Sequence, residues 1–180
     1  MWRLLSGGRK ERKSPVKSDD DGTLRGLKIR GYRRRDRAEV LQIAAASFDG
    51  VSLDENIQQH FGRIGHEWRQ LKQQAVDYDL GGNPTSVLVA ELDGRIVAFA
   101  CNRLYRQRRI GHVANLAVAP PLQGKGIGKL LLEASMQHFR DTGMRYVRIE
   151  TLAQNEKADR FYRSIGFQEV GRQVYFFKEL

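Results

Sequence analysis

The chain contains 180 residues, of which 41% are hydrophobic and 29% are charged. This length and composition are typical of one soluble globular domain. No apolar run approaches the roughly 20 residues that cross a bilayer, so we expect no membrane association. The single cysteine, Cys101, excludes an internal disulfide and favours a reducing, cytoplasmic location. Its apolar, strand-like neighbours indicate a buried small side chain.

The formal net charge of +10 is concentrated at the beginning of the chain. Residues 1–37 hold 13 Lys or Arg against 5 Asp or Glu, whereas the remaining residues hold 18 against 16. Residues 1–22 contain few apolar side chains, so we predict a disordered basic and polar tail, followed by one domain over 23–180. Two alternatives are a basic arm over 1–37 that contacts nucleic acid or the ribosome and a transit peptide, against which Asp19–Asp21 argue.

The first predicted elements are a strand and a helix. Leu27–Tyr32 alternates apolar and polar side chains, which indicates a strand. The triplet Arg33–Arg35 follows; it could bind a phosphate, but a solvated strand end is the favoured interpretation. Asp36 is then expected to cap a helix that runs to about Phe48.

The segment Leu53–Leu80 carries apolar side chains at alternating steps of four and three, which is typical of one face of a helix. Gly62 and Gly65 interrupt this face, and a glycine inside a helix costs about 1 kcal/mol relative to alanine. We therefore predict two helices, or one helix that bends near these glycines.

A hairpin follows, with Ser86–Leu92 and Arg95–Tyr105 joined at Asp93-Gly94, a strong hairpin signal. Four arginines crowd the end of this hairpin. They could recognise acidic groups, although a solvated turn is the favoured interpretation; these arginines are Arg103, Arg106, Arg108 and Arg109.

The last third of the chain alternates strands and helices. A strand begins at His112, a glycine loop spans Gln123–Gly128, and a helix runs to about Asp141. The later elements are a strand over Tyr146–Thr151, a helix over Asn155–Ile165, and two final strands over Phe167–Val170 and Gln173–Lys178. This order predicts an α/β (mixed α+β) fold with a central mixed sheet flanked by helices.

The glycine loop suggests an anion site. A strand that enters a glycine-rich turn and then a helix presents backbone N–H groups and the positive end of the helix dipole to a phosphate. The P-loop motif does not fit, because no Lys-Ser/Thr pair ends the loop. The dinucleotide fingerprint does not fit either, because its third glycine would fall at Lys129.

The loop resembles the acetyl-CoA loop of the GNAT family of N-acetyltransferases, Q/R-x-x-G-x-G/A, with Gln123, Gly126 and Gly128 at the defined positions. The preceding Asn115–Pro120, N-L-A-V-A-P, is also typical of that family. The resemblance covers about residues 27–178. It implies a GNAT-type acyl-CoA N-acyltransferase fold with a twisted, mostly antiparallel sheet, and acetyl-CoA as cosubstrate.

The resemblance also implies which residues bind the cofactor. Backbone N–H groups of the loop would bind the pyrophosphate, and a splayed strand would pair with the acetyl-pantetheine arm. The loop residues are Gln123, Gly124, Lys125, Gly126, Ile127, Gly128 and Lys129, and the strand residues are Leu116, Ala117 and Val118. Asn155 matches a cofactor-binding asparagine of the family, although N-capping of its helix is an equally good interpretation.

Two side chains match family positions that carry the chemistry. Tyr162, within A-x-x-F-Y-x-x-x-G-F, would protonate the departing thiolate; a packing tyrosine is the alternative. Glu150 matches a glutamate that acts as base in some members, among them ribosomal-protein alanine acetyltransferases, and is structural in others. A water could replace it as the base. His60, His66 and Trp68 lie in the region that would flank the acceptor, but exposed histidines and a core tryptophan are the favoured interpretations.

The sequence therefore predicts an N-acetyltransferase that moves the acetyl group of acetyl-CoA to a primary amine by direct attack in a ternary complex. The acceptor, a small molecule or a peptide or protein amino group, stays open, as does the choice between monomer and homodimer. No metal site is predicted. The alternative function is a non-catalytic acyl-CoA-binding or interaction module. A dinucleotide enzyme, with Glu150 as the ribose-binding acid, fits less well.

Overall fold

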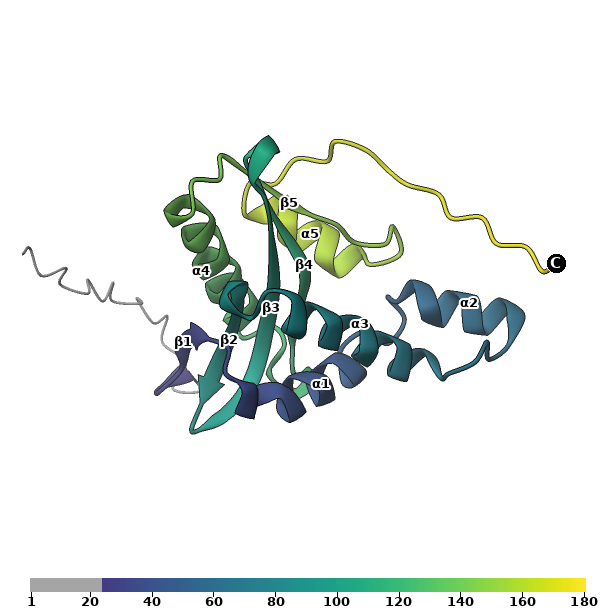
Figure 1. Ribbon diagram of the computed structural model, residues 1–180, viewed down its shortest axis with the longest axis horizontal. Helices are drawn as coiled ribbons and strands as arrows, with labels where there is room; N and C mark the ends of the chain where they lie inside the picture. The colour runs from purple at the N-terminus through teal and green to yellow at the C-terminus, as the bar shows by residue number, and fades with distance from the viewer. Residues whose placement is uncertain (1–23) are drawn as a thin grey trace, which may run out of the picture.

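The computed structural model describes residues 24–180; the tail predicted over 1–22 lies outside the described residues. Among these residues, five strands form one sheet in the order β1-β2-β3-β4-β5 (Figure 1). Neighbouring strands are antiparallel except β4 and β5, which are parallel, so the predicted mixed, mostly antiparallel sheet is confirmed. The strands are β1 Lys28–Gly31, β2 Val87–Leu92, β3 Arg95–Tyr105, β4 Ile110–Val118 and β5 Tyr146–Ile149.

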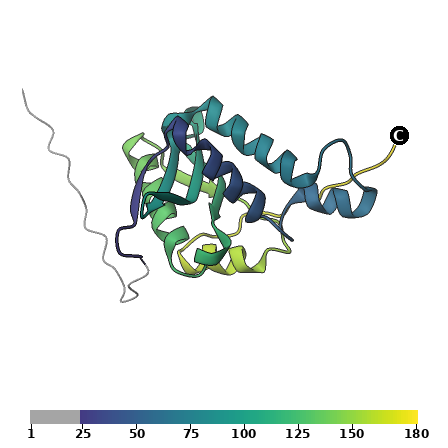
Figure 2. The same cartoon turned by 90° about the horizontal axis from the view of Figure 1, so that it is seen from below.

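Helices cover both faces of the sheet. Figure 2 shows α1 and α3 on one side and α4 and α5 on the other, while α2 extends beyond the sheet. The helices are α1 Arg37–Ala46, α2 Leu53–Phe61, α3 Trp68–Gly82, α4 Ile127–Asp141 and α5 Glu156–Ser164; short 3-10 turns are η2 Arg34–Asp36, η3 Pro84–Ser86, η4 Arg106–Arg108 and η5 Pro120–Leu122. Within residues 24–180, no helix is both long and apolar enough to cross a membrane.

The core consists of two apolar layers, one on each face of the sheet. On one face, Val40 of α1 and Val76 of α3 pack against Phe99 of β3, and all three are fully buried. On the other, Leu131 and Phe139 of α4 lie against β3 and β4. Because both faces are covered, the central strands are buried almost continuously, and they hold the polar side chains of the site rigidly.

The expected elements of the first half of the chain are largely confirmed. The stretch Leu53–Leu80 forms two helices, because Gly62 and Gly65 adopt φ angles of 75° and 71°, which interrupt a right-handed helix. The hairpin turn is formed by Asp93 and Gly94 at φ 49° and 78°, as a two-residue turn between twisted strands requires.

Asp36 lies where a helix cap was expected, but its side chain has a different partner. It makes no side-chain hydrogen bond to α1. Instead its carboxylate accepts hydrogen bonds from the guanidinium of Arg30 at 2.7 and 2.9 Å and from the N–H of Arg33 at 2.7 Å. The Arg30 guanidinium holds the pKa of Asp36 below its usual value. The expected capping contact is therefore replaced by one that fastens β1 to the start of α1.

The two strands predicted at the end of the chain are wrong. Phe167–Val170 and Gln173–Lys178 contain no strand, and the chain leaves α5 as an extended coil (Figure 1). A strand needs a partner for its backbone groups, and an alternating pattern does not supply one. Here Glu169 forms ion pairs with Arg163 of α5 and with Arg172, and neither partner lies in the sheet. Among the described residues, β5 is therefore one edge strand of the sheet, and β1 is the other.

Candidate active site

The glycine loop connects β4 to α4 through backbone conformations that glycine adopts most easily. After the 3-10 turn Pro120–Leu122, Gly124 and Gly126 both have φ near 81°, and Gly126 immediately precedes the first helical residue. Ile127 is buried beneath the loop, and an added Cβ on Gly128 would lie 3.6 Å from Cγ2 of Val118. The beginning of α4 therefore lies next to the end of β4.

A run of backbone donors in this loop has no acceptor. Among the described residues, the N–H groups of Gly124–Lys129 make no hydrogen bond. The Gln123 side chain holds the loop in place: its amide donates to the Val118 carbonyl at 3.1 Å and accepts from Nζ of Lys157 at 3.1 Å. Lys125 and Lys129 are exposed beside these donors. Six donors, two ammonium groups and a helix N-terminus suit an anion such as a pyrophosphate.

The strand before the loop is open on one side. The pairing of β4 with β5 ends at Val113 and Ile149, although β4 continues beside β3 as far as Val118. Leu116–Val118 therefore have a neighbouring strand on one side only, as predicted for a splayed strand. An extended ligand could pair with this side of β4, and the glycine loop directly follows this part of the strand.

Tyr162 lies on the α4 side of this opening. Together with Leu116 it packs against the cluster of Val113, Leu132 and Phe139. Burial raises the pKa of Tyr162 to about 12. The phenol is therefore protonated at neutral pH and has an O–H donor.

Asn155 caps α5, as one of its two interpretations expected. Its side-chain oxygen accepts a hydrogen bond from the N–H of Ala158 at 3.1 Å. This contact fixes the beginning of the helix that carries Tyr162. It uses the side-chain oxygen and leaves the amide NH₂ as a further donor.

Glu150 follows Ile149, the last residue of β5, and therefore lies where the pairing of β4 with β5 ends. Its side chain is 56% exposed, and Oε2 accepts a hydrogen bond from Nε of Arg148 at 2.7 Å. The second carboxylate oxygen, Oε1, lies 3.3 Å from Nε2 of His112, which is buried. A carboxylate held this way can accept a proton from a group that approaches from solvent.

The α3 side of β4 carries a polar network that the sequence did not reveal. Nζ of Lys72 donates to Oδ1 of Asn115 at 2.7 Å, and the Asn115 amide donates to Oδ2 of Asp79 at 2.9 Å. The guanidinium of Arg103 donates to Oδ1 of Asp79 at 2.6 and 2.9 Å. Burial lowers the pKa of Lys72. The only sequence signal was that His112 and Asn115 are polar residues within an apolar strand.

The other side chains singled out in the sequence lie where the simpler interpretations placed them. His60 and His66 are exposed, and Trp68 is buried. Cys101 is buried in β3, and burial raises the pKa of its thiol to about 12. Arg106 and the remaining arginines beyond β3 lie on an exposed turn, with Arg103 as the exception because it binds Asp79.

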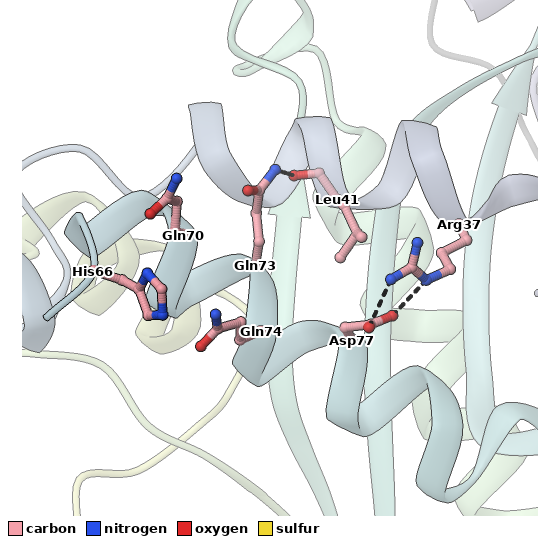
Figure 3. A pocket seen from close by; sticks show the side chains of 7 residues that line it. All are labelled: Arg37, Leu41, His66, Gln70, Gln73, Gln74 and Asp77. Carbon is pink, nitrogen blue, oxygen red and sulfur yellow. Dashed lines mark hydrogen bonds and ion pairs between the residues drawn. The ribbon is translucent and has the colours of Figure 1, made fainter.

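A depression of about 310 Å³ lies on the surface between α1 and α3, away from these groups (Figure 3). The Arg37–Asp77 ion pair lies at one end, and the Gln73 amide donates to the Leu41 carbonyl within it. Its lining contains none of the predicted catalytic or cofactor-binding residues, and consists of Arg37, Leu41, His66, Gln70, Gln73, Gln74 and Asp77.

Comparison with solved structures identifies the fold as that of the N-acetyltransferases. A crystal structure from Pyrococcus horikoshii matches with a TM-score of 0.67 and 20% identity, over 82% of this chain and 92% of that one. The PaiA N-acetyltransferase of Thermoplasma acidophilum, in complex with coenzyme A, matches with a TM-score of 0.64 and 20% identity, over 79% and 89% of the two chains.

The model of the acetyltransferase (GNAT) family matches residues 51–167, and the chain belongs to this family. The mycothiol acetyltransferase of Propionibacterium freudenreichii subsp. shermanii is 32% identical over 157 residues, which cover 83% of this chain and 45% of that protein. The chain spans less than half of the length of the mycothiol acetyltransferases that it matches.

Proposed function

We propose that the protein is an acetyl-CoA-dependent N-acetyltransferase that transfers the acetyl group to a primary amine by direct attack in a ternary complex. The observation that carries this proposal is the row of unpaired N–H groups over Gly124–Lys129, next to the open side of Leu116–Val118. One part suits a pyrophosphate and the other an extended arm. Both belong to one continuous segment, as a cosubstrate with these two parts requires.

The residues of this segment fit acetyl-CoA. The loop N–H groups, with Lys125 and Lys129, would hold the pyrophosphate, and the Gln123 side chain would keep the loop in place. Leu116–Val118 would align the acetyl arm through backbone groups. When bound, the cosubstrate supplies an activated thioester; the protein supplies its orientation.

Two side chains on opposite sides of β4 would move the protons. Tyr162, which is partly buried and protonated, would donate a proton to the departing thiolate. Glu150, which is half exposed beside the opening, would take a proton from the acceptor amine through Oε1. In this assignment Asn155 supports Tyr162 by capping α5 and can also donate its amide to the cosubstrate.

The proposed acceptor is a primary amine, and two classes of molecule can supply it. The match to mycothiol acetyltransferases supports an amine of a small molecule, and a peptide or protein amino group is the second class. We also propose a cytoplasmic location, because the buried Cys101 thiol is compatible with a reducing compartment. A single domain over 23–180, monomeric or dimeric, completes the proposal. Contact of residues 1–37 with nucleic acid or the ribosome stays the less favoured alternative; of these residues, Arg33–Arg35 are exposed.

Calorimetry of the full chain with acetyl-CoA tests the cosubstrate. We expect binding that Gly126→Val weakens at least tenfold, because a side chain at φ 81° distorts the loop. Gly31→Val, on β1 with no atom within 4 Å of an added Cβ, is the matched control and should bind normally. Absence of acetyl-CoA binding by the unmodified chain would contradict the proposal.

Thiol release from acetyl-CoA then tests the reaction. The acceptors are an amino sugar, a polyamine, a lysine-containing peptide and a peptide with a free α-amine, and mass spectrometry identifies the acetylated product. We expect turnover with at least one of these amines. Binding of acetyl-CoA without turnover on any of them would favour the non-catalytic acyl-CoA-binding module.

A further inference from the structure

A buried histidine faces the proposed base. The His112 side chain is 5% exposed, and its Nε2 atom lies 3.3 Å from Oε1 of Glu150. Within the described residues, neither ring nitrogen of His112 makes a hydrogen bond of good geometry. A buried polar group without a partner is destabilising and rare, so this arrangement needs an explanation.

The sheet brings these residues together through a bulge and a parallel pairing. Val113 pairs with Asn102 and Asn115 with Cys101, so Ala114 is an extra residue on β4. This bulge turns His112 and Asn115, three positions apart, toward the same α3 side. On the other edge of β4, His112 pairs with Arg148, and Glu150 follows two residues later.

The surroundings of His112 determine its protonation. Burial lowers the pKa of His112; Arg148 of β5 and Arg103 of β3 lower it further, while Glu150 and Asp79 of α3 raise it. The outcome is a lowered pKa, and the imidazole is neutral at pH 7. Tyr105 stacks on the ring, with centroids 6.0 Å apart, and fixes its plane.

A neutral imidazole has one N–H and one lone pair. Two lone pairs would repel each other if Nε2 faced the Glu150 carboxylate without its proton, so the tautomer with Nε2–H is favoured. The other oxygen of Glu150, Oε2, is bound by Arg148. Oε1 therefore has a lone pair left for an incoming proton, and Nε2–H of His112 determines where that lone pair points.

We propose that His112 is a positioning residue for the base, holding Oε1 of Glu150 toward the opening between β4 and β5. This inference rests on the proposed function, in which Glu150 removes the proton from the acceptor amine. One N–H bond of the acceptor breaks and one O–H bond forms on Oε1. The imidazole keeps its own proton throughout and contacts the carboxylate, not the acceptor.

Histidine-selective ¹⁵N NMR of the full chain tests the contact without any acceptor. We expect the neutral His112 ring to carry its proton on Nε2 between pH 6.5 and 8. Glu150→Gln should lower the pKa of His112 further, because the anion that raises it is lost. His138, which contacts Ser86, should be unaffected. A proton on Nδ1, or a pKa of His112 that does not change in Glu150→Gln, would overturn the proposal.

Kinetics with acetyl-CoA and the best amine of the panel test whether His112 contributes to turnover. His112→Leu should lower kcat about 10- to 100-fold, because the Nε2–H group that faces Oε1 of Glu150 at 3.3 Å is lost, and leave the Kd for acetyl-CoA within about twofold.

Two further variants separate positioning from folding. His112→Gln keeps an N–H donor near the Nε2 position and should recover most of the lost kcat, whereas His138→Gln is the matched control and should react normally. Equal losses in His112→Gln and His112→Leu, or an unchanged kcat in both, would refute the positioning role. Absence of turnover by the unmodified chain would instead contradict the proposed function, while the NMR result still decides the contact.

Discussion

The two sides of β4 carry buried side chains of opposite character. Toward α4 and α5 the strand presents Gly111, Val113 and Leu116, and Tyr162 packs beside them. The buried polar pair on that side, Asn102 and Ser135, is uncharged. Toward α3 it presents His112 and Asn115, which join a network of charged and amide side chains. The apolar side is suited to packing a ligand arm, and the polar side to binding a charged acceptor and moving protons. One strand thus separates two chemical environments.

The largest expected effect comes from removing Asp79 from the polar network on the α3 side of β4. Asp79→Ala removes the acceptor of both Arg103 and Asn115, and leaves the buried amide of Asn115 without that partner, whereas Arg103 is half exposed. We expect the free energy of unfolding to fall by about 3 kcal/mol, measured by urea denaturation. Asp77→Ala removes an exposed ion pair with Arg37 from the same helix and should leave the denaturation midpoint almost unchanged. A similar midpoint for both variants would show that the network is not structural.

On the apolar side, Tyr162→Phe tests whether the Tyr162 hydroxyl donates a proton in the reaction or whether the side chain only packs. We expect kcat to fall about 100-fold, equivalent to about 2.7 kcal/mol, with the Kd for acetyl-CoA within about twofold. Steady-state kinetics and calorimetry measure the two constants separately. Tyr78→Phe, at an exposed tyrosine of α3, is the control. Unchanged turnover in Tyr162→Phe would assign Tyr162 to packing.

A smaller effect is expected at Gly111, also on the apolar side. An added Cβ would overlap the ring of Phe139, which is fully buried and cannot move away easily. Gly111→Ala should lower the free energy of unfolding by about 2 kcal/mol. Gly31→Ala, in β1 with open space around it, should change it by less than about 0.5 kcal/mol. Equal stability of the two variants would mean that α4 moves freely on β4.

The smallest effect concerns pH. Burial lowers the pKa of both His112 and His138, one on each side of the sheet. Because the unfolded chain then binds more protons, stability is fully present above about pH 6.5 and decreases as pH falls. Urea denaturation at pH 7.5 and 5.5 should show this decrease, and it should be smaller in His138→Asn. The exposed His60→Asn should not alter it, and a decrease of equal size in all three proteins would contradict the assignment.

The parts of the site built from local sequence were predictable. The glycine loop needs positive φ at Gly124 and Gly126, and this requirement is visible in the residue types. Asn155 as a cap and the break between α2 and α3 follow from equally local rules. The end of the chain shows the limit of this approach, because the apolar alternation over Gln173–Lys178 predicted a strand and the structure shows none.

The sequence by itself therefore determined the glycine loop over Gln123–Gly128, the strand before it and the helix that carries Tyr162, since each depends on residues within a few positions of one another. Only the tertiary structure decided that Glu150 faces His112, and that Asp79 joins Asn115 to Arg103. A strict alternation along β4 places His112 and Asn115 on opposite sides. The bulge at Ala114 reverses this, and a bulge depends on how β3 and β4 pair, which no local pattern encodes.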